Sequence, residues 1–152
     1  MPFADFALAY DADSRSCDLV LAADGLVLDR TPLTALLVSL GTDRLARADD
    51  ELPQPEEAGE APAQLNPRRG WWGDALDSRG QIGSRLWLLE RRKQAEQTRR
   101  DAQTYCAEAL DWIESRRATP VTLRVSWLRR GVLGITARAG SDSIDVQQPV
   151  LA

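Results

Sequence analysis

Carboxylates are the only side chains in this sequence that could form a pair for acid–base catalysis. The 152-residue chain contains no histidine, which excludes Ser-His-Asp and Cys-His nucleophilic sites and the HExxH zinc motif. Asp74 and Asp77 lie beside two tryptophans, and Glu90 follows a third. Glycosidases hold two carboxyl groups about 5–10 Å apart around a sugar. A carboxylate-dependent hydrolase is therefore one hypothesis; the alternative is that Asp74, after Gly73, accepts hydrogen bonds from backbone amides in a turn.

Tryptophan and arginine are concentrated in the same stretch, NPRRGWWGDALDSRGQIGSRLWLLERRK, residues 66–93, which holds three of the five tryptophans. Aromatic rings between arginines are typical of single-stranded nucleic-acid platforms. The cations are Arg68, Arg69, Arg79, Arg85, Arg91, Arg92 and Lys93. However, no RRM, KH or zinc signature is present, and the chain carries a net charge of −4. GQIGSR also lacks the Gly-Lys-Ser/Thr ending of a phosphate loop. We therefore predict no nucleic-acid partner, no small-molecule substrate, no cofactor and no metal site.

A protein interface is the third hypothesis, because tryptophan and arginine are the side chains that anchor interfaces. Trp71 and Trp72 stand between Gly70 and Gly73, which permit unusual backbone angles. We expect at least one of the two rings to face a partner. Trp87 lies in the apolar run LWLL and is predicted to be core.

Charge is distributed unevenly along the chain. Residues 1–66 carry 13 acidic and 4 basic side chains, a net charge of −9, whereas residues 67–152 carry 10 acidic and 15 basic, a net charge of +5. This asymmetry is compatible with nucleic-acid binding, with acidic and basic surfaces that meet in an assembly, or with the solvated faces of one domain.

Hydrophobic periodicity predicts the elements that position these residues. In FADFALAY apolar and other residues alternate, which predicts a strand, and DLVLAADGLVLD predicts a hairpin with an Asp-Gly turn. Residues 31–41 predict a short helix with Thr31 as the N-cap; the alternative is that Leu37 and Val38 lie in a strand. Residues 47–66 are acidic and proline-rich and predict an exposed loop.

The second half of the sequence predicts a long amphipathic helix over residues 92–116, with Glu108 on its exposed surface. A β-hairpin follows over residues 121–137, and residues 141–152 are expected to be a flexible tail or a late edge strand. Together these elements predict a single α+β domain over residues 1–152. Cys17 and Cys106 are expected to be buried thiols, and the absence of a long apolar run predicts no membrane insertion.

Four motifs occur in a characteristic order: SLGTDRLARADDELP, RGWWGD, GSRLWLLERRK and YCAEALDWI. In this order and spacing the chain resembles the Mu-like phage baseplate wedge family of contractile tails. That family is similar to the small wedge subunit of larger contractile-tailed phages, once labelled a lysozyme. The resemblance spans roughly residues 4–140.

The resemblance implies a structural, non-enzymatic protein of the virion tail baseplate that is assembled in the bacterial host cytoplasm. Its implied partners are other wedge, hub and sheath proteins, which it would contact to support sheath attachment. We expect the informative interface or motif positions to be Trp71, Trp72, Asp74, Arg85 and Trp87. A lysozyme-like cell-wall hydrolase remains the alternative.

Overall fold

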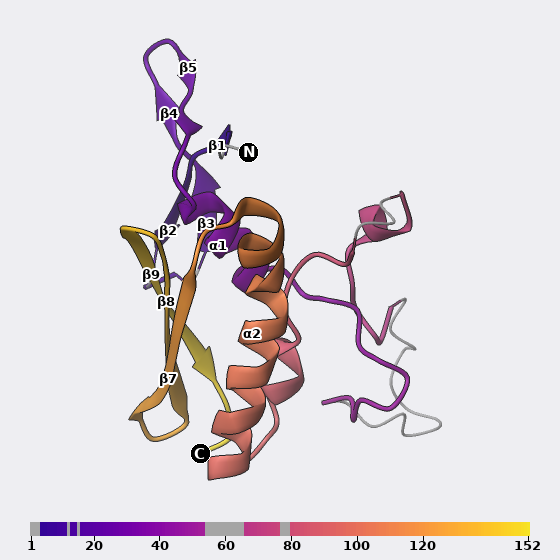
Figure 1. Cartoon of the computed structure of the whole chain (residues 1–152). Helices are drawn as coiled ribbons and strands as arrows, with labels where there is room; N and C mark the ends of the chain where they lie inside the picture. The colour runs from indigo at the N-terminus through magenta and orange to yellow at the C-terminus, as the bar shows by residue number, and fades with distance from the viewer. Residues whose placement is uncertain (1–3, 12, 15, 54–65, 77–79) are drawn as a thin grey trace.

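A computed structural model of the chain describes residues 4–11, 13–14, 16–53, 66–76 and 80–152. It has the predicted α+β architecture (Figure 1). A long helix packs against a three-stranded antiparallel sheet, a short helix contacts both of them, and a narrow β-structure at the N-terminus extends away from this body. Among the described residues no helix is long and apolar enough to cross a membrane.

Residues 5–29 form the N-terminal extension, which we call the arm. It contains β1 (Asp5–Phe6), β2 (Leu8–Asp11), β3 (Ser16–Leu19), β4 (Leu21–Ala22), β5 (Gly25–Leu26) and β6 (Leu28–Asp29). The antiparallel pairs are β1 with β6, β2 with β3 and β4 with β5. The predicted turn precedes Gly25, whose φ of +127° suits glycine. The β4–β5 pair confirms the tip of the predicted hairpin. Its outer residues pair with the first strand instead of with each other, Leu19 with Leu8 and Leu28 with Phe6.

Helix α1 (Leu33–Gly41) confirms the predicted short helix and buries Leu36, Leu37 and Leu40. Its N-terminus is satisfied by two side chains. Thr31 Oγ1 accepts a hydrogen bond from the Leu33 amide at 3.2 Å, although the N-cap position is held by Pro32, one residue later than predicted. Asp29 Oδ2 accepts another from the Thr34 amide at 2.9 Å, so the arm also supplies a helix cap.

Helix α2 (Glu96–Arg117) follows two 3₁₀ turns, η1 (Trp72–Leu76) and η2 (Leu86–Leu89). Its predicted apolar stripe is buried: Ala102, Cys106, Ala109 and Ile113. The helix begins later than residue 92 because the backbone at Arg92 and Gln94 pairs with that of Leu151, at 2.9 and 3.0 Å. It ends at Ala118, which adopts a left-handed φ of 53°.

The C-terminal sheet has the order β7-β8-β9, from β7 (Val121–Arg129), β8 (Val132–Ala139) and β9 (Asp142–Pro149). The first two strands are the predicted hairpin, turned at Gly131 with φ +71°. The expectation of a flexible tail is wrong over residues 142–149. Ile144 and Val146 pack against the core and pair with Ala137 and Ile135, so the edge-strand alternative holds.

The core lies between α2 and the inner face of the sheet, with α1 closing one side. Cys106 is fully buried there, but the expectation of a buried Cys17 is wrong: it is an exposed free thiol on the arm, none of whose described residues belongs to this core. Of the acidic loop 47–66, residues 54–65 lie outside the described part. In the part described, the Asp50 side chain is 11% exposed and pairs with Arg85, which differs from the exposed loop that we predicted.

Candidate protein interface

The two adjacent tryptophans lie on the surface, where the chain enters η1. Trp72 is 78% exposed and Trp71 44%, and nearby Leu76 is 82% exposed. Their ring centroids are 5.6 Å apart, with the planes tilted by 44°. A Cβ atom on Gly73 would lie 2.2 Å from the Trp71 ring, so only glycine lets that indole fold back over the backbone. The local sequence W-W-G thus fixes one ring and leaves the next in solvent.

Arg69 anchors the tryptophan loop to the body of the protein. Its guanidinium donates hydrogen bonds to Asp43 at 2.8 Å and to Glu90 at 3.2 Å. It also lies 4.5 Å from the centroid of the Trp87 ring, within cation–π range. The next residue, Gly70, has φ +93°, and a Cβ there would lie 2.9 Å from the Leu45 side chain. A close backbone approach therefore holds the two tryptophans in place.

Asp74 fixes the other end of the loop. Its Oδ1 accepts a hydrogen bond from the Ile82 amide at 3.0 Å, a backbone contact of the kind that the structural alternative for this residue predicts. Its Oδ2 is buried and has no hydrogen-bond partner in the described part of the chain. Glu90, another candidate acid, is held by Arg69. Asp77, the remaining carboxylate of the hydrolase hypothesis, lies outside the described residues.

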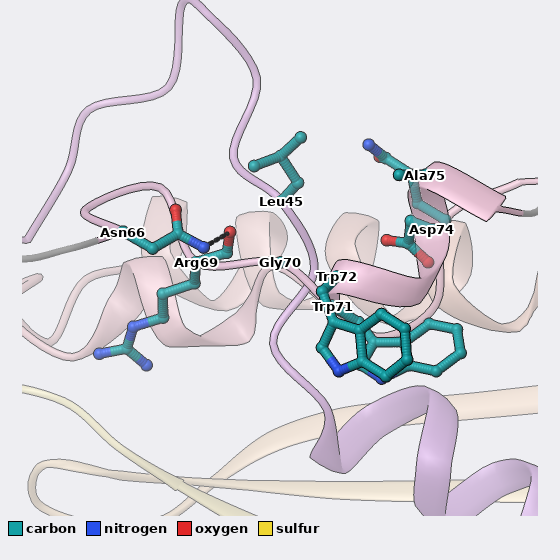
Figure 2. Close-up of a pocket in the computed structure, with 9 residues that line it drawn as sticks. Leu45, Asn66, Arg69, Gly70, Trp71, Trp72, Asp74 and Ala75 are labelled. Atoms are coloured by element: carbon teal, nitrogen blue, oxygen red, sulfur yellow. Dashed lines mark hydrogen bonds between the residues drawn. The ribbon is translucent and has the colours of Figure 1, made fainter.

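An open cavity of about 570 Å³ lies beside the tryptophans (Figure 2). Its lining is Leu45, Asn66, Arg69, Gly70, Trp71, Trp72, Asp74, Ala75 and Gln81. Asn66 donates a hydrogen bond to the Arg69 carbonyl at 2.6 Å and so closes one rim. Among the described residues no group of three or more His, Cys, Asp or Glu side chains is placed to hold a metal ion.

Arg85 is buried, 4% exposed, and is the centre of an ion-pair network. Its guanidinium donates to Asp50 at 2.7 and 2.9 Å and to Glu108 at 2.7 and 3.1 Å. It also lies 4.5 Å from the Tyr105 ring centroid. The expectation that Glu108 occupies the exposed surface of the long helix is therefore wrong, because it turns toward this arginine. No local pattern could have identified Asp50 or Glu108 as its partners.

Trp87 is buried, as predicted, and is 4% exposed. It packs with Ala46 and Leu88 in a small second cluster, and its indole N–H donates to the Arg44 carbonyl at 2.9 Å. Of the five predicted positions, Trp71, Trp72 and Asp74 line one cavity, and Trp87 contacts this site through Arg69. Arg85 lies in a separate contact network with Asp50, Glu108 and Tyr105. Leu45 and Leu76 are additional exposed side chains around the tryptophans that sequence reasoning missed.

The fold and this surface define a small α+β protein that carries an aromatic loop on a rigid frame. A comparison with known families matches residues 32–144 to the family described as phage protein GP46. The chain belongs to this family, as its motifs suggested.

Two curated relatives carry the gp46 name, and one of them is a baseplate protein. The chain is 38% identical over 116 residues to the baseplate protein gp46 of Escherichia phage Mu, which covers 74% of this chain and 73% of that protein. It is also 38% identical over 96 residues to the Mu-like prophage FluMu protein gp46 of Haemophilus influenzae, covering 63% and 57% respectively. No solved structure matches significantly. The chain is therefore a phage baseplate protein, with a prophage homologue.

Proposed function

We propose that this baseplate protein is a non-enzymatic wedge subunit, and that the Trp71–Trp72 surface docks on a neighbouring baseplate protein. The observation that carries the proposal is the exposure of Trp72 on a braced loop. Burying an exposed indole under a partner lowers the free energy of the complex, and aromatic anchors of this kind are the usual interface hot spots. Hub and sheath proteins are the further proposed neighbours.

Preorganisation of the loop supports a docking role. Arg69 ties one end to Asp43 and Glu90, and Asp74 ties the other to the Ile82 amide. A partner therefore meets rings that are already placed, which lowers the entropy cost of binding. In addition, β7 and β9 are the outer strands of the C-terminal sheet. An outer strand offers main-chain hydrogen bonds to a strand from a sheath subunit or another wedge protein.

The alternative function, a lysozyme-like hydrolase, has less support from the geometry. A general acid needs a carboxyl group whose proton is available to the substrate. Asp74 instead accepts a backbone hydrogen bond, and Glu90 is engaged with Arg69. Three arginines of the nucleic-acid hypothesis are engaged with carboxylates: Arg85 with two, Arg69 with two, and Arg92 with Glu51.

The interface is tested by a W71A/W72A variant in a phage or prophage that lacks its own copy of the gene. We expect soluble, folded protein and loss of assembled tails, scored by electron microscopy and infective titre. Because Trp71 also packs over Gly73, the single W72A variant separates docking from loop stability. R100A, on the exposed face of α2, is the matched control and should assemble normally. Normal yields of contracting tails from W72A and W71A/W72A would refute the interface.

The hydrolase alternative is tested with the purified protein on peptidoglycan. We expect no release of soluble fragments. Turnover by the wild type that Asp74→Asn abolishes would replace the structural proposal with the enzymatic one.

A further inference from the structure

The arm exposes an apolar face that its own chain does not cover. Side chains directly opposite each other across a strand pair lie on the same face. The three two-stranded sheets of the arm place Phe6 opposite Leu28, Leu8 opposite Leu19, and Leu21 opposite Leu26. The exposed members include Leu21 at 74% and Leu28 at 58%. Phe6, Leu19 and Leu26 are also among the exposed large apolar residues. Exposed apolar side chains that lie close together mark contact sites.

The arm is also strongly acidic. Residues 4–29 contain six aspartates and one arginine. Asp18 and Asp24 are exposed, and each is close in sequence to one of the exposed leucines. A surface that covers this arm must therefore combine apolar contact with positive charge.

The opposite end of the same molecule has that combination. We call it the basic pole: Lys93, Leu128, Arg129, Arg130 and Leu151. All five side chains are exposed. Three contacts bring them together, two between backbones and one to a side chain. Lys93 forms a β-bridge with Leu151, the Gly131 amide donates to the Gln94 side chain at 3.0 Å, and the Val150 amide donates to the Gly131 carbonyl at 2.9 Å.

The arm and the basic pole cannot meet within one chain. The β4–β5 tip of the arm and the β7–β8 turn lie at opposite ends of the molecule, with the body between them (Figure 1). We propose that the acidic, leucine-rich face of the arm docks on the basic pole of a second copy of this chain. Such a contact is head-to-tail, so it builds rings or open chains instead of closed two-fold dimers. It does not involve the Trp71–Trp72 surface.

Sedimentation velocity of the purified full chain tests the contact. We expect an average mass that rises with concentration and falls when salt is added, because the screening length drops to about 3 Å at 1 M ionic strength. W72A should associate like the wild type, which separates this contact from the proposed docking surface. A wild-type chain that stays monomeric up to about 100 μM at low salt overturns the proposal, because the contact would then be too weak to be specific.

Two variants, each defective in one of the two surfaces, test whether the arm of one copy meets the basic pole of another. L21S/L28S removes apolar contact from the arm, and R129E/R130E reverses the charge of the pole. Each alone should associate at least about tenfold more weakly than the wild type. Mixed in equal amounts they should form a dimer and nothing larger, because only one intact arm and one intact pole remain. If R129E/R130E associates as well as the wild type, the arm meets some other surface and the proposal is wrong.

Cross-linking gives a second test that leaves the arm unchanged. Cys17 is an exposed thiol on the arm, whereas Cys106 is buried. In the R130C variant a short bismaleimide should join Cys17 of one copy to the new thiol of another. In R100C, whose new thiol lies on the exposed face of α2, the yield should be no higher than in the wild type. Equal yields in the two variants would contradict the proposed contact.

Discussion

Arg85 holds together three segments that are distant in sequence, and its removal tests the energetic reasoning most directly. Its side chain is 5% exposed, Asp50 is 11% and Glu108 is 24% exposed. Replacing it with methionine keeps much of the volume but leaves two largely buried carboxylates without their main partner. Removing one partner of a buried ion pair costs about 3–5 kcal/mol.

For Arg85→Met we expect the lower end of this range. Glu108 retains a salt bridge to Arg47 at 2.6 Å and is partly hydrated, which limits its penalty. A loss of about 3 kcal/mol corresponds to a decrease in Tm of roughly 6–12 °C for a chain of this size. Urea denaturation followed by circular dichroism measures the free energy of unfolding, and a thermal scan measures Tm.

The pH dependence of stability gives the same prediction a second readout. Burial raises the pKa of the Glu108 carboxyl, but hydrogen bonds from Arg85 and Arg47 outweigh burial and hold the pKa below its usual value. A carboxyl whose folded pKa is lowered stabilises the fold above its unfolded pKa of about 4.3, and this contribution is lost as pH falls through the folded pKa. Arg85→Met should therefore lose less stability than the wild type over that acidic interval.

Arg100→Met is the matched control, because it removes an exposed ion pair with Glu96 in which the side chains are 67% and 55% exposed. It should cost at most about 0.5 kcal/mol. If Arg85→Met costs no more than this control, the buried network does not stabilise the fold as we reason.

Three further predictions concern glycines and thiols. Gly83→Ala should destabilise the protein by about 1–3 kcal/mol, measured by urea denaturation, because its φ is +92° and the new Cβ would lie 2.3 Å from the Thr42 carbonyl oxygen. Gly41→Ala is the control, since a Cβ at Gly41 would meet nothing within 4 Å. It should be neutral or stabilising by up to about 1 kcal/mol. Gly73→Ala should displace the Trp71 ring and change the near-ultraviolet circular dichroism, and an unchanged spectrum would contradict the packing of that ring over Gly73. Burial raises the pKa of the Cys106 thiol to about 12. A thiol reagent should therefore modify Cys17 alone in native protein and both cysteines in urea. Two reactive thiols in the native state would refute the burial of Cys106.

Local sequence patterns predicted the elements whose stability depends on neighbours along the chain. Helical spacing identified α1 and the buried stripe of α2, and strict alternation with a glycine turn identified the β7–β8 hairpin. The apolar run around Trp87 predicted a buried ring, and the order of the motifs indicated the family. Each of these signals lies within a short window, because periods of 3.6 and 2 residues are properties of the backbone.

The tertiary structure alone decided which side chains face each other. Arg85 meets Asp50 and Glu108, which are 35 and 23 residues away in sequence, and no periodicity encodes such a pairing. The alternating residues of the arm predict a strand, but not that its apolar face stays in water, because exposure depends on what packs above it. For the same reason the sequence identified Trp71 and Trp72 as candidates, whereas the fold determined which indole rests on Gly73 and which is left for a partner.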